Sequence, residues 1–139
     1  MAHRAVIDTN VLFEGLARRG AAGAVIDAWV ARRFTPCVST ALALEYEEVL
    51  MSKFGEPKRQ HVAGALQALL DRAEFVPVPT PARPISPDPD DDMVIECALG
   101  ARATIVTRNT RDFLAAEQAL GLVVLTPEAF ITRLGEELL

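Results

Sequence analysis

Short runs of β-branched residues alternate along this chain with longer stretches of helical periodicity. The first run is Arg4–Ile7, and the later ones also lie between predicted helices. Strands separated by helices pair in parallel, because a parallel neighbour requires a crossover of about a dozen residues or more. The alternation therefore predicts an α/β fold with a central parallel sheet of about five strands and helices on both faces.

Residues typical of helix starts and helix ends indicate the boundaries of the predicted elements. Ser39 and the Asp88-Pro89 pair are typical of helix starts, and Gly55 of a helix end. The predicted strands are Arg4–Ile7, Thr35–Val38, Phe75–Val78, Thr104–Thr107 and Leu122–Leu125. The predicted helices are Val11–Arg19, Ala21–Arg33, Ser39 to about Lys53, Pro57 to about Arg72, Asp88 to about Arg102, one from Thr110 and one from Thr126-Pro127. Six prolines between positions 77 and 89 predict an extended connection.

Length and composition limit the class of protein. The 139 residues suit one domain spanning 1–139. The apolar runs are far shorter than the roughly 20 residues that a transmembrane helix needs, so no membrane span is expected. With an acid already at Asp8 we expect no signal peptide, and Cys37 and Cys97 are expected as buried thiols of a cytoplasmic protein. A net charge of −5 argues against tight, sequence-independent nucleic-acid binding unless the acids gather and hold a metal.

Acidic residues follow the strands at several places. Asp8 ends the first strand, Glu45 lies six residues after Ser39, and Asp112 follows the fourth strand. Asp88 and the 90–92 run open the helix before that strand. Parallel strands place their carboxyl ends at one edge of the sheet, so these carboxylates are expected to meet there and repel one another. A divalent cation relieves that repulsion, and all-oxygen ligands suit Mg²⁺ or Mn²⁺ better than zinc.

Each of these residues also has a structural explanation when taken alone. Asp8 and Asp112 suit turns or caps, Glu45 suits a solvated helix face, and the 90–92 run suits a helix N-terminus. Ser39 is better explained as a cap than as a catalytic hydroxyl. The coincidence of all the acids on one edge is what favours a site.

Four segments carry a resemblance to a known family. They are VIDTNVL at 6–12, Ser39-x5-Glu45, DMVIECA at 92–98 and IVTRNTRDF at 105–113. In this order, over nearly the whole chain, they resemble the PIN-domain nucleases and, within them, the VapC-type toxins of toxin–antitoxin systems. The resemblance implies a single Rossmann-like PIN domain with Mg²⁺- or Mn²⁺-dependent endoribonuclease activity on RNA. It also implies a cognate antitoxin as partner and a homodimer.

The resemblance assigns roles to particular residues. Many relatives carry an acid two residues after the strand-four Thr, where this chain has Asn109, so either Asp112 takes that role or Asn109 assists. Asn10 and Thr107 are candidates for orienting the carboxylates, or simply form turns. Arg108 and Arg111 are expected either to clamp phosphates or to pair with nearby acids. The catalytic and metal-binding candidates are Asp8, Glu45, Asp92 and Asp112, and the orienting candidates are Asn10, Ser39, Thr107 and Asn109.

Two other classes of function compete with this interpretation. A PIN-like RNA-binding or scaffold protein with a degenerate metal site is the main alternative, because of Asn109. A receiver-like or phosphatase-like domain phosphorylated on Asp8 is disfavoured. A phosphatase of that kind requires a second Asp at position 10, which is Asn, and a receiver requires a late Lys, whereas none follows Lys58.

Overall fold

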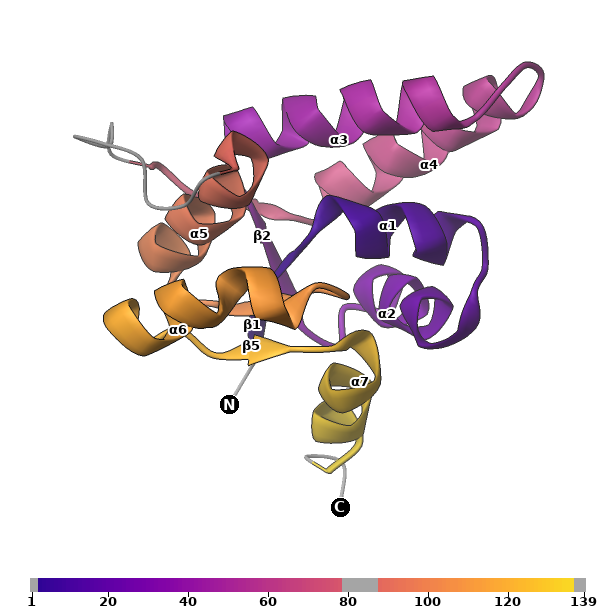
Figure 1. Cartoon of the computed structure of the whole chain (residues 1–139). Coiled ribbons are helices and arrows are strands. Elements are labelled where there is room, and N and C mark those ends of the chain that lie inside the picture. Colours follow the sequence, from indigo (N-terminus) through magenta and orange to yellow (C-terminus); the bar gives the residue numbers. More distant parts are fainter. Residues whose placement is uncertain (1–2, 79–87, 137–139) are drawn as a thin grey trace.

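The computed structural model describes residues 3–78 and 88–136, and within them five strands form one parallel sheet (Figure 1). The strand order is β3-β2-β1-β4-β5. Every neighbouring pair is parallel. The strands are β1 (Arg4–Ile7), β2 (Thr35–Val38), β3 (Glu74–Phe75), β4 (Thr104–Val106) and β5 (Val124–Leu125). The predicted α/β class and five-stranded parallel sheet are confirmed.

Seven α-helices and one 3₁₀ helix connect these strands in the described part of the chain. They are α1 (Thr9–Leu16), α2 (Gly20–Val30), α3 (Thr40–Lys53), α4 (Lys58–Asp71), α5 (Pro89–Ala101), η1 (Thr110–Phe113), α6 (Leu114–Leu120) and α7 (Pro127–Glu136). Helix α5 contacts β1, β2 and β4, whereas α2 packs against α1 and α7 across the sheet from it (Figure 1). Helices therefore cover both faces, as predicted.

Most predicted boundaries hold to within a few residues. Helix α1 starts two residues early because the Asp8 side chain accepts a hydrogen bond from Thr9 N at 2.8 Å and caps the helix. Ser39 Oγ accepts one from Leu42 N at 3.0 Å, so its capping role is confirmed. Strands β3 and β5 are only two residues long, because each is an edge strand paired on one side. The expectation of an extended proline-rich connection falls largely on residues 79–87, which lie outside the described residues.

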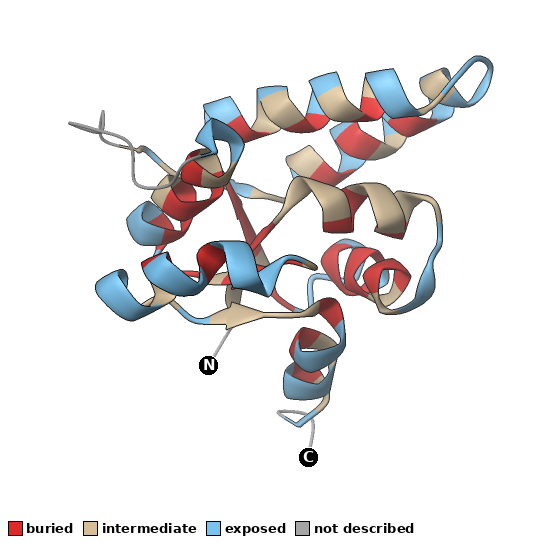
Figure 2. Ribbon diagram, viewed as in Figure 1, coloured by how far each residue is buried: buried red, intermediate tan, exposed pale blue. Residues whose placement is uncertain are grey.

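The core lies between the helices and the sheet, where buried residues face one another in Figure 2. Trp29 belongs to it, and its indole Nε1 donates to Leu69 O at 2.9 Å. Cys37 and Cys97 are buried thiols, as expected. None of the helices in residues 3–78 and 88–136 has the length and apolar character to cross a bilayer.

The chain reverses its direction of winding at β1. It first moves from β1 to β2 and β3 and then returns, through α5, to β4 on the other side of β1. In open parallel sheets such a switch point leaves a crevice at the carboxyl ends of the two strands. Here that crevice follows Ile7 and Val106, which is where the predicted acids begin.

Candidate active site

Asp8 and Thr107 lie side by side at this switch point. Asp8 N donates to Val106 O at 2.9 Å, which fixes the end of β1 against β4. The buried Thr107 Oγ1 donates to Asp8 Oδ2 at 2.7 Å and accepts from Asn109 N at 3.0 Å. A side chain at the end of the neighbouring strand β4 thus holds the carboxylate of Asp8 in one orientation.

A second hydrogen bond supports β1 from the helical side. Tyr46 is fully buried on α3, and its hydroxyl donates to Ile7 O at 2.5 Å, one residue before Asp8. Burial holds the pKa of Tyr46 well above its ordinary value, so this hydroxyl stays protonated as a donor. No local pattern in the sequence indicates this role, because Tyr46 and Ile7 are 39 residues apart.

The carboxylate of Asp8 lies in an acidic environment. Burial raises its pKa above the ordinary value, the hydrogen bonds from Thr107 and Thr9 oppose that rise, and the charges of Asp112 and Asp88 add to it. A raised pKa means that the charged form is poorly compensated by the protein alone. A cation at this position would supply the missing compensation.

Asp91 is the member of the 90–92 run that joins this group. Burial raises its pKa to about 6, and the charges of Asp88, Asp8 and Asp112 contribute. It lies one turn into α5, and Asp88 caps that helix by accepting from Asp90 N at 2.9 Å. The structure therefore brings Asp8, Asp88, Asp91 and Asp112 into one electrostatic group at the carboxyl edge of the sheet.

Asp92, which the resemblance selected, lies at a different position on the same helix. Its side chain is buried, and its charge raises the pKa of Glu96 one turn further along α5. The helical period does not distinguish the two positions, because Val94 leads back to position 91 in a step of three and Ile95 leads back to position 92 in the same way.

Glu45 lies at the margin of the acidic group. It is half-buried on α3, and burial raises its pKa, with contributions from Asp90, Glu48, Asp88 and Asp8. Asp112 is exposed at the first turn of η1, and its backbone N–H donates to Asn109 O. Glu45 on α3 and Asp112 on η1 thus both lie at the margin of the acidic group around Asp8.

The two candidate arginines differ in their surroundings. Arg108 donates from Nε to Glu14 at 3.1 Å and from its terminal nitrogen to both oxygens of Glu128, at 2.6 and 2.7 Å. Those ion pairs favour the structural alternative for Arg108 over phosphate binding. Arg111 is exposed on η1, close in sequence to Asp112.

The donor chemistry fits a divalent cation. Among residues 3–78 and 88–136, no three His, Cys, Asp or Glu side chains lie close enough to enclose a metal ion. Mg²⁺ and its analogues commonly keep several waters and take only one or two carboxylates, so a full protein cage is not required. Within the described residues, Asn10 Oδ1 is buried and accepts no hydrogen bond. This amide oxygen, two residues after Asp8, is a further acceptor that a cation or its water could use.

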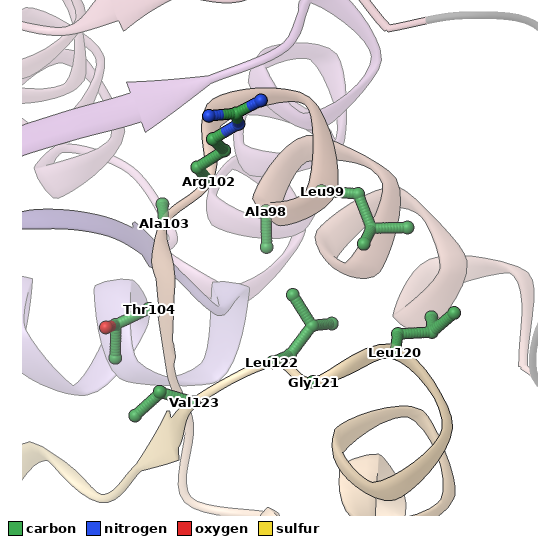
Figure 3. Close-up of a pocket in the computed structure, with 9 residues that line it drawn as sticks. All are labelled: Ala98, Leu99, Arg102, Ala103, Thr104, Leu120, Gly121, Leu122 and Val123. Carbon is green, nitrogen blue, oxygen red and sulfur yellow. The ribbon is translucent and has the colours of Figure 1, made fainter.

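A separate hollow lies at the other end of the sheet. It has a volume of about 290 Å³ and is lined by Arg102 from the end of α5, Thr104 from the start of β4 and Leu122 from the segment before β5, among others (Figure 3). Its walls are largely aliphatic. Because the acids follow the strands and this hollow precedes β4, it is not part of the acidic site.

Comparisons with known proteins agree with this geometry. Residues 4–111 match the family described as PIN domain. No curated protein matches the sequence significantly. Among solved structures, VapBC2 from Rickettsia felis, bound to a DNA fragment from its promoter, is similar with a TM-score of 0.61 at 14% identity, covering 88% of this chain and 98% of that chain.

Two further structures are similar at comparable levels. VapBC-1 from nontypeable Haemophilus influenzae has a TM-score of 0.60 at 16% identity, covering 90% of this chain and 98% of that one. The PIN domain endonuclease Utp24 has a TM-score of 0.53 at 17% identity, covering 88% and 84%. At these identities the structures establish a shared fold, and the match over residues 4–111 establishes the family. This chain therefore belongs to the PIN domain family, a nuclease family.

Proposed function

We propose that this protein is a Mg²⁺- or Mn²⁺-dependent endoribonuclease that acts as the toxin of a toxin–antitoxin system. The observation that carries the proposal is the group of carboxylates around Asp8 at the switch point of the sheet. Family membership and the likeness of the fold to VapBC structures support it. The proposal includes one catalytic domain over residues 1–139, a homodimer, a cytoplasmic location and a cognate antitoxin.

Asp8 and Asp91 are the residues that we expect to hold the metal. Burial raises the pKa of both carboxyl groups, and the charges of neighbouring acids, including Asp112, add to the rise; Glu45 and Asp112 would assist them. When bound, the cation would lower the pKa of a water molecule and neutralise charge on the phosphate. The resemblance assigns this role to Asp92, and variants at both positions test that prediction.

The remaining candidate residues orient the Asp8 carboxylate and its loop or contact the substrate. Thr107 fixes the Asp8 carboxylate through the 2.7 Å hydrogen bond, and Tyr46 fixes the carbonyl that precedes it. Asn10 offers its buried amide oxygen near the same position, and Asn109 anchors the loop through its bond to Thr107. Arg111 remains the candidate for contact with the phosphate backbone of the substrate, and Ser39 caps α3.

The test is cleavage of labelled single-stranded and structured RNAs in Mg²⁺, Mn²⁺ or chelator. We expect metal-dependent products from the wild-type protein and none from Asp8→Asn, which keeps the shape of the side chain and removes its charge. Cleavage that persists in pure Asp8→Asn protein would refute the catalytic role of the acidic group. If no RNA is cut and calorimetry detects no carboxylate-dependent metal binding, the degenerate RNA-binding alternative replaces this proposal.

A further inference from the structure

A second polar feature of the surface lies at the carboxyl end of α1, the end away from Asp8. Side chains from the ends of α1 and α3 and the start of α4 form a hollow of about 570 Å³. We call it the cationic hollow and define it by Phe13, Arg19, Lys53, Phe54, Lys58 and His61. Both lysines of the whole chain lie in it, and none of the described residues that line it is acidic.

The cations of this hollow are held over an aromatic floor. Phe13 and Phe54 pack with their ring centroids 5.2 Å apart. Lys53 Nζ lies 4.8 Å from the Phe13 centroid, and the Arg19 guanidinium lies 5.6 Å from it. Such cation–π contacts hold a charged group in place without neutralising it. The hollow therefore presents fixed positive charge rather than a bare ring on which a base could stack.

The cations of the hollow differ from the neighbouring Arg18 in whether a carboxylate pairs with them. Arg18, which also borders the hollow, donates two hydrogen bonds to Asp27, at 3.0 and 3.1 Å. Within the described residues, Arg19, Lys53 and Lys58 form no ion pair with a carboxylate. In a chain of net charge −5, this is an unusual local excess of positive charge.

The hollow and the acidic group lie at opposite ends of the same pair of helices. Near the start of the pair lie Asp8 and Glu45, and near its end Lys53 contacts Phe13. Asp8 and Phe13 belong to α1 and its cap, while Glu45 and Lys53 belong to α3. At 1.5 Å per residue the two regions are about 8–12 Å apart along the helix axes.

We propose that the cationic hollow binds backbone phosphates of the single-stranded RNA whose scissile phosphate lies at the acidic group. The inference rests on the proposed ribonuclease function for the identity of the polyanion. An acidic site repels the substrate it must cleave, so a fixed patch of positive charge a few nucleotides away supplies the affinity. Because the contact is to phosphates, it confers little preference for base sequence.

The experiment compares two variants with the same change in charge. Lys53→Gln/Lys58→Gln removes two cations from the hollow, and Arg33→Gln/Arg133→Gln removes two exposed cations elsewhere. Binding of a fluorescein-labelled single-stranded RNA is measured by anisotropy in chelator, over a range of salt concentrations. Tm values of all proteins confirm that the variants are folded.

We expect the lysine variant to bind RNA severalfold more weakly than wild type. Its slope of log K against log salt should fall by about 1.4, because each phosphate contact on a single strand contributes about 0.7. In cleavage assays KM should rise while kcat stays unchanged, since the contact is equal in the ground and transition states. The arginine control should behave like wild type in both respects. Equal losses in the two variants, or no loss in either, would overturn the proposal.

Two further outcomes separate this proposal from the others. Lysine-dependent RNA binding without cleavage in any metal would refute the ribonuclease but retain the hollow as an RNA contact. If the lysine variant cleaves RNA with unchanged binding affinity and KM, the proposed ribonuclease function stands and only the RNA-binding role of the cationic hollow is refuted. A labelled oligoglutamate peptide is tested in parallel, and lysine-dependent binding of that peptide in place of RNA would assign the hollow to an acidic protein partner and overturn the proposal.

Discussion

Thr107 Oγ1 donates a 2.7 Å hydrogen bond to Asp8 Oδ2, although the two residues are 99 positions apart in the chain. The bond joins the carboxyl ends of β1 and β4 at the point where the sheet reverses its winding. The same hydroxyl accepts the backbone N–H of Asn109, so one side chain orients both the carboxylate and the loop that leads to Asp112.

Replacing Thr107 tests this relationship. Thr107→Val keeps the volume but removes the donor to Asp8, and we expect metal affinity and cleavage to fall by about 10- to 100-fold, as is usual when a residue that orients a metal ligand is lost. Thr107→Ser keeps the hydroxyl and should retain most of both. Metal binding is measured by calorimetry with Mn²⁺. Equal affinities in the Val and Ser variants would mean that the bond has no orienting role.

Variants at positions 91 and 92 distinguish the two candidate ligands. Asp91→Asn should abolish metal-dependent cleavage, because Asp91 is coupled to Asp8 and Asp112. Asp92→Asn should leave metal affinity nearly unchanged and affect mainly stability, since Asp92 is buried further along α5. Cleavage rates and Mn²⁺ affinities of the two variants are compared at equal protein concentration. The reverse result would restore Asp92 as the ligand predicted by the resemblance.

The folding stability of the metal-free protein should depend on pH through the carboxyl group of Asp91. Its pKa of about 6 in the folded protein exceeds its ordinary value of 3.8, so the folded state binds this proton more tightly than the unfolded chain does. The resulting stabilisation is fully present below about pH 4 and is lost as pH rises through 6. Because the group is partly exposed and screened, we expect the loss to be at most about 1 kcal/mol. In chelator, the Tm difference between wild type and Asp91→Asn should therefore change between about pH 4 and 6 and level off above that range, and a constant difference would contradict the raised pKa.

Asp8→Asn should stabilise the metal-free protein. The carboxylate is half-buried near Asp88 and Asp112, and removing its charge relieves that repulsion while an amide oxygen can still accept from Thr107. We expect a gain of about 1 kcal/mol, or about 4 °C in Tm for a domain of this size. The measurement is thermal unfolding in chelator at pH 7. With saturating Mn²⁺ the order should reverse, because only the wild-type protein gains binding energy.

Replacing Arg108 and replacing Arg111 should have different effects on stability and RNA binding. Arg108→Gln breaks the ion pairs with Glu14 and Glu128, and since these groups are partly exposed we expect a loss of about 0.5–1 kcal/mol in stability with no change in RNA affinity. Arg111→Gln should weaken RNA binding without lowering the Tm. Denaturant unfolding and RNA anisotropy on the same two preparations check both statements. Loss of RNA affinity in Arg108→Gln would show that its ion pairs open for the substrate.

The sequence by itself determined the order of the elements, the parallel sheet and the family. These follow from local signals that act over a few residues, such as the N-cap at Ser39 and the β-branched run Arg4–Ile7. It also located the edge of the sheet at which the acids gather, because parallel strands share that edge in any such fold.

Only the tertiary structure decided which side chains meet at that edge. The charge of Asp8 reaches Asp91 on α5, and the position of that helix is set by its packing on β1, β2 and β4. Arg108 is paired with carboxylates from α1 and α7, 94 and 20 residues away, which no local pattern records. The cationic hollow likewise depends on α3 ending beside α1. Each of these contacts is fixed by packing between elements distant in sequence, so a motif could name the residue types and their order but not their neighbours.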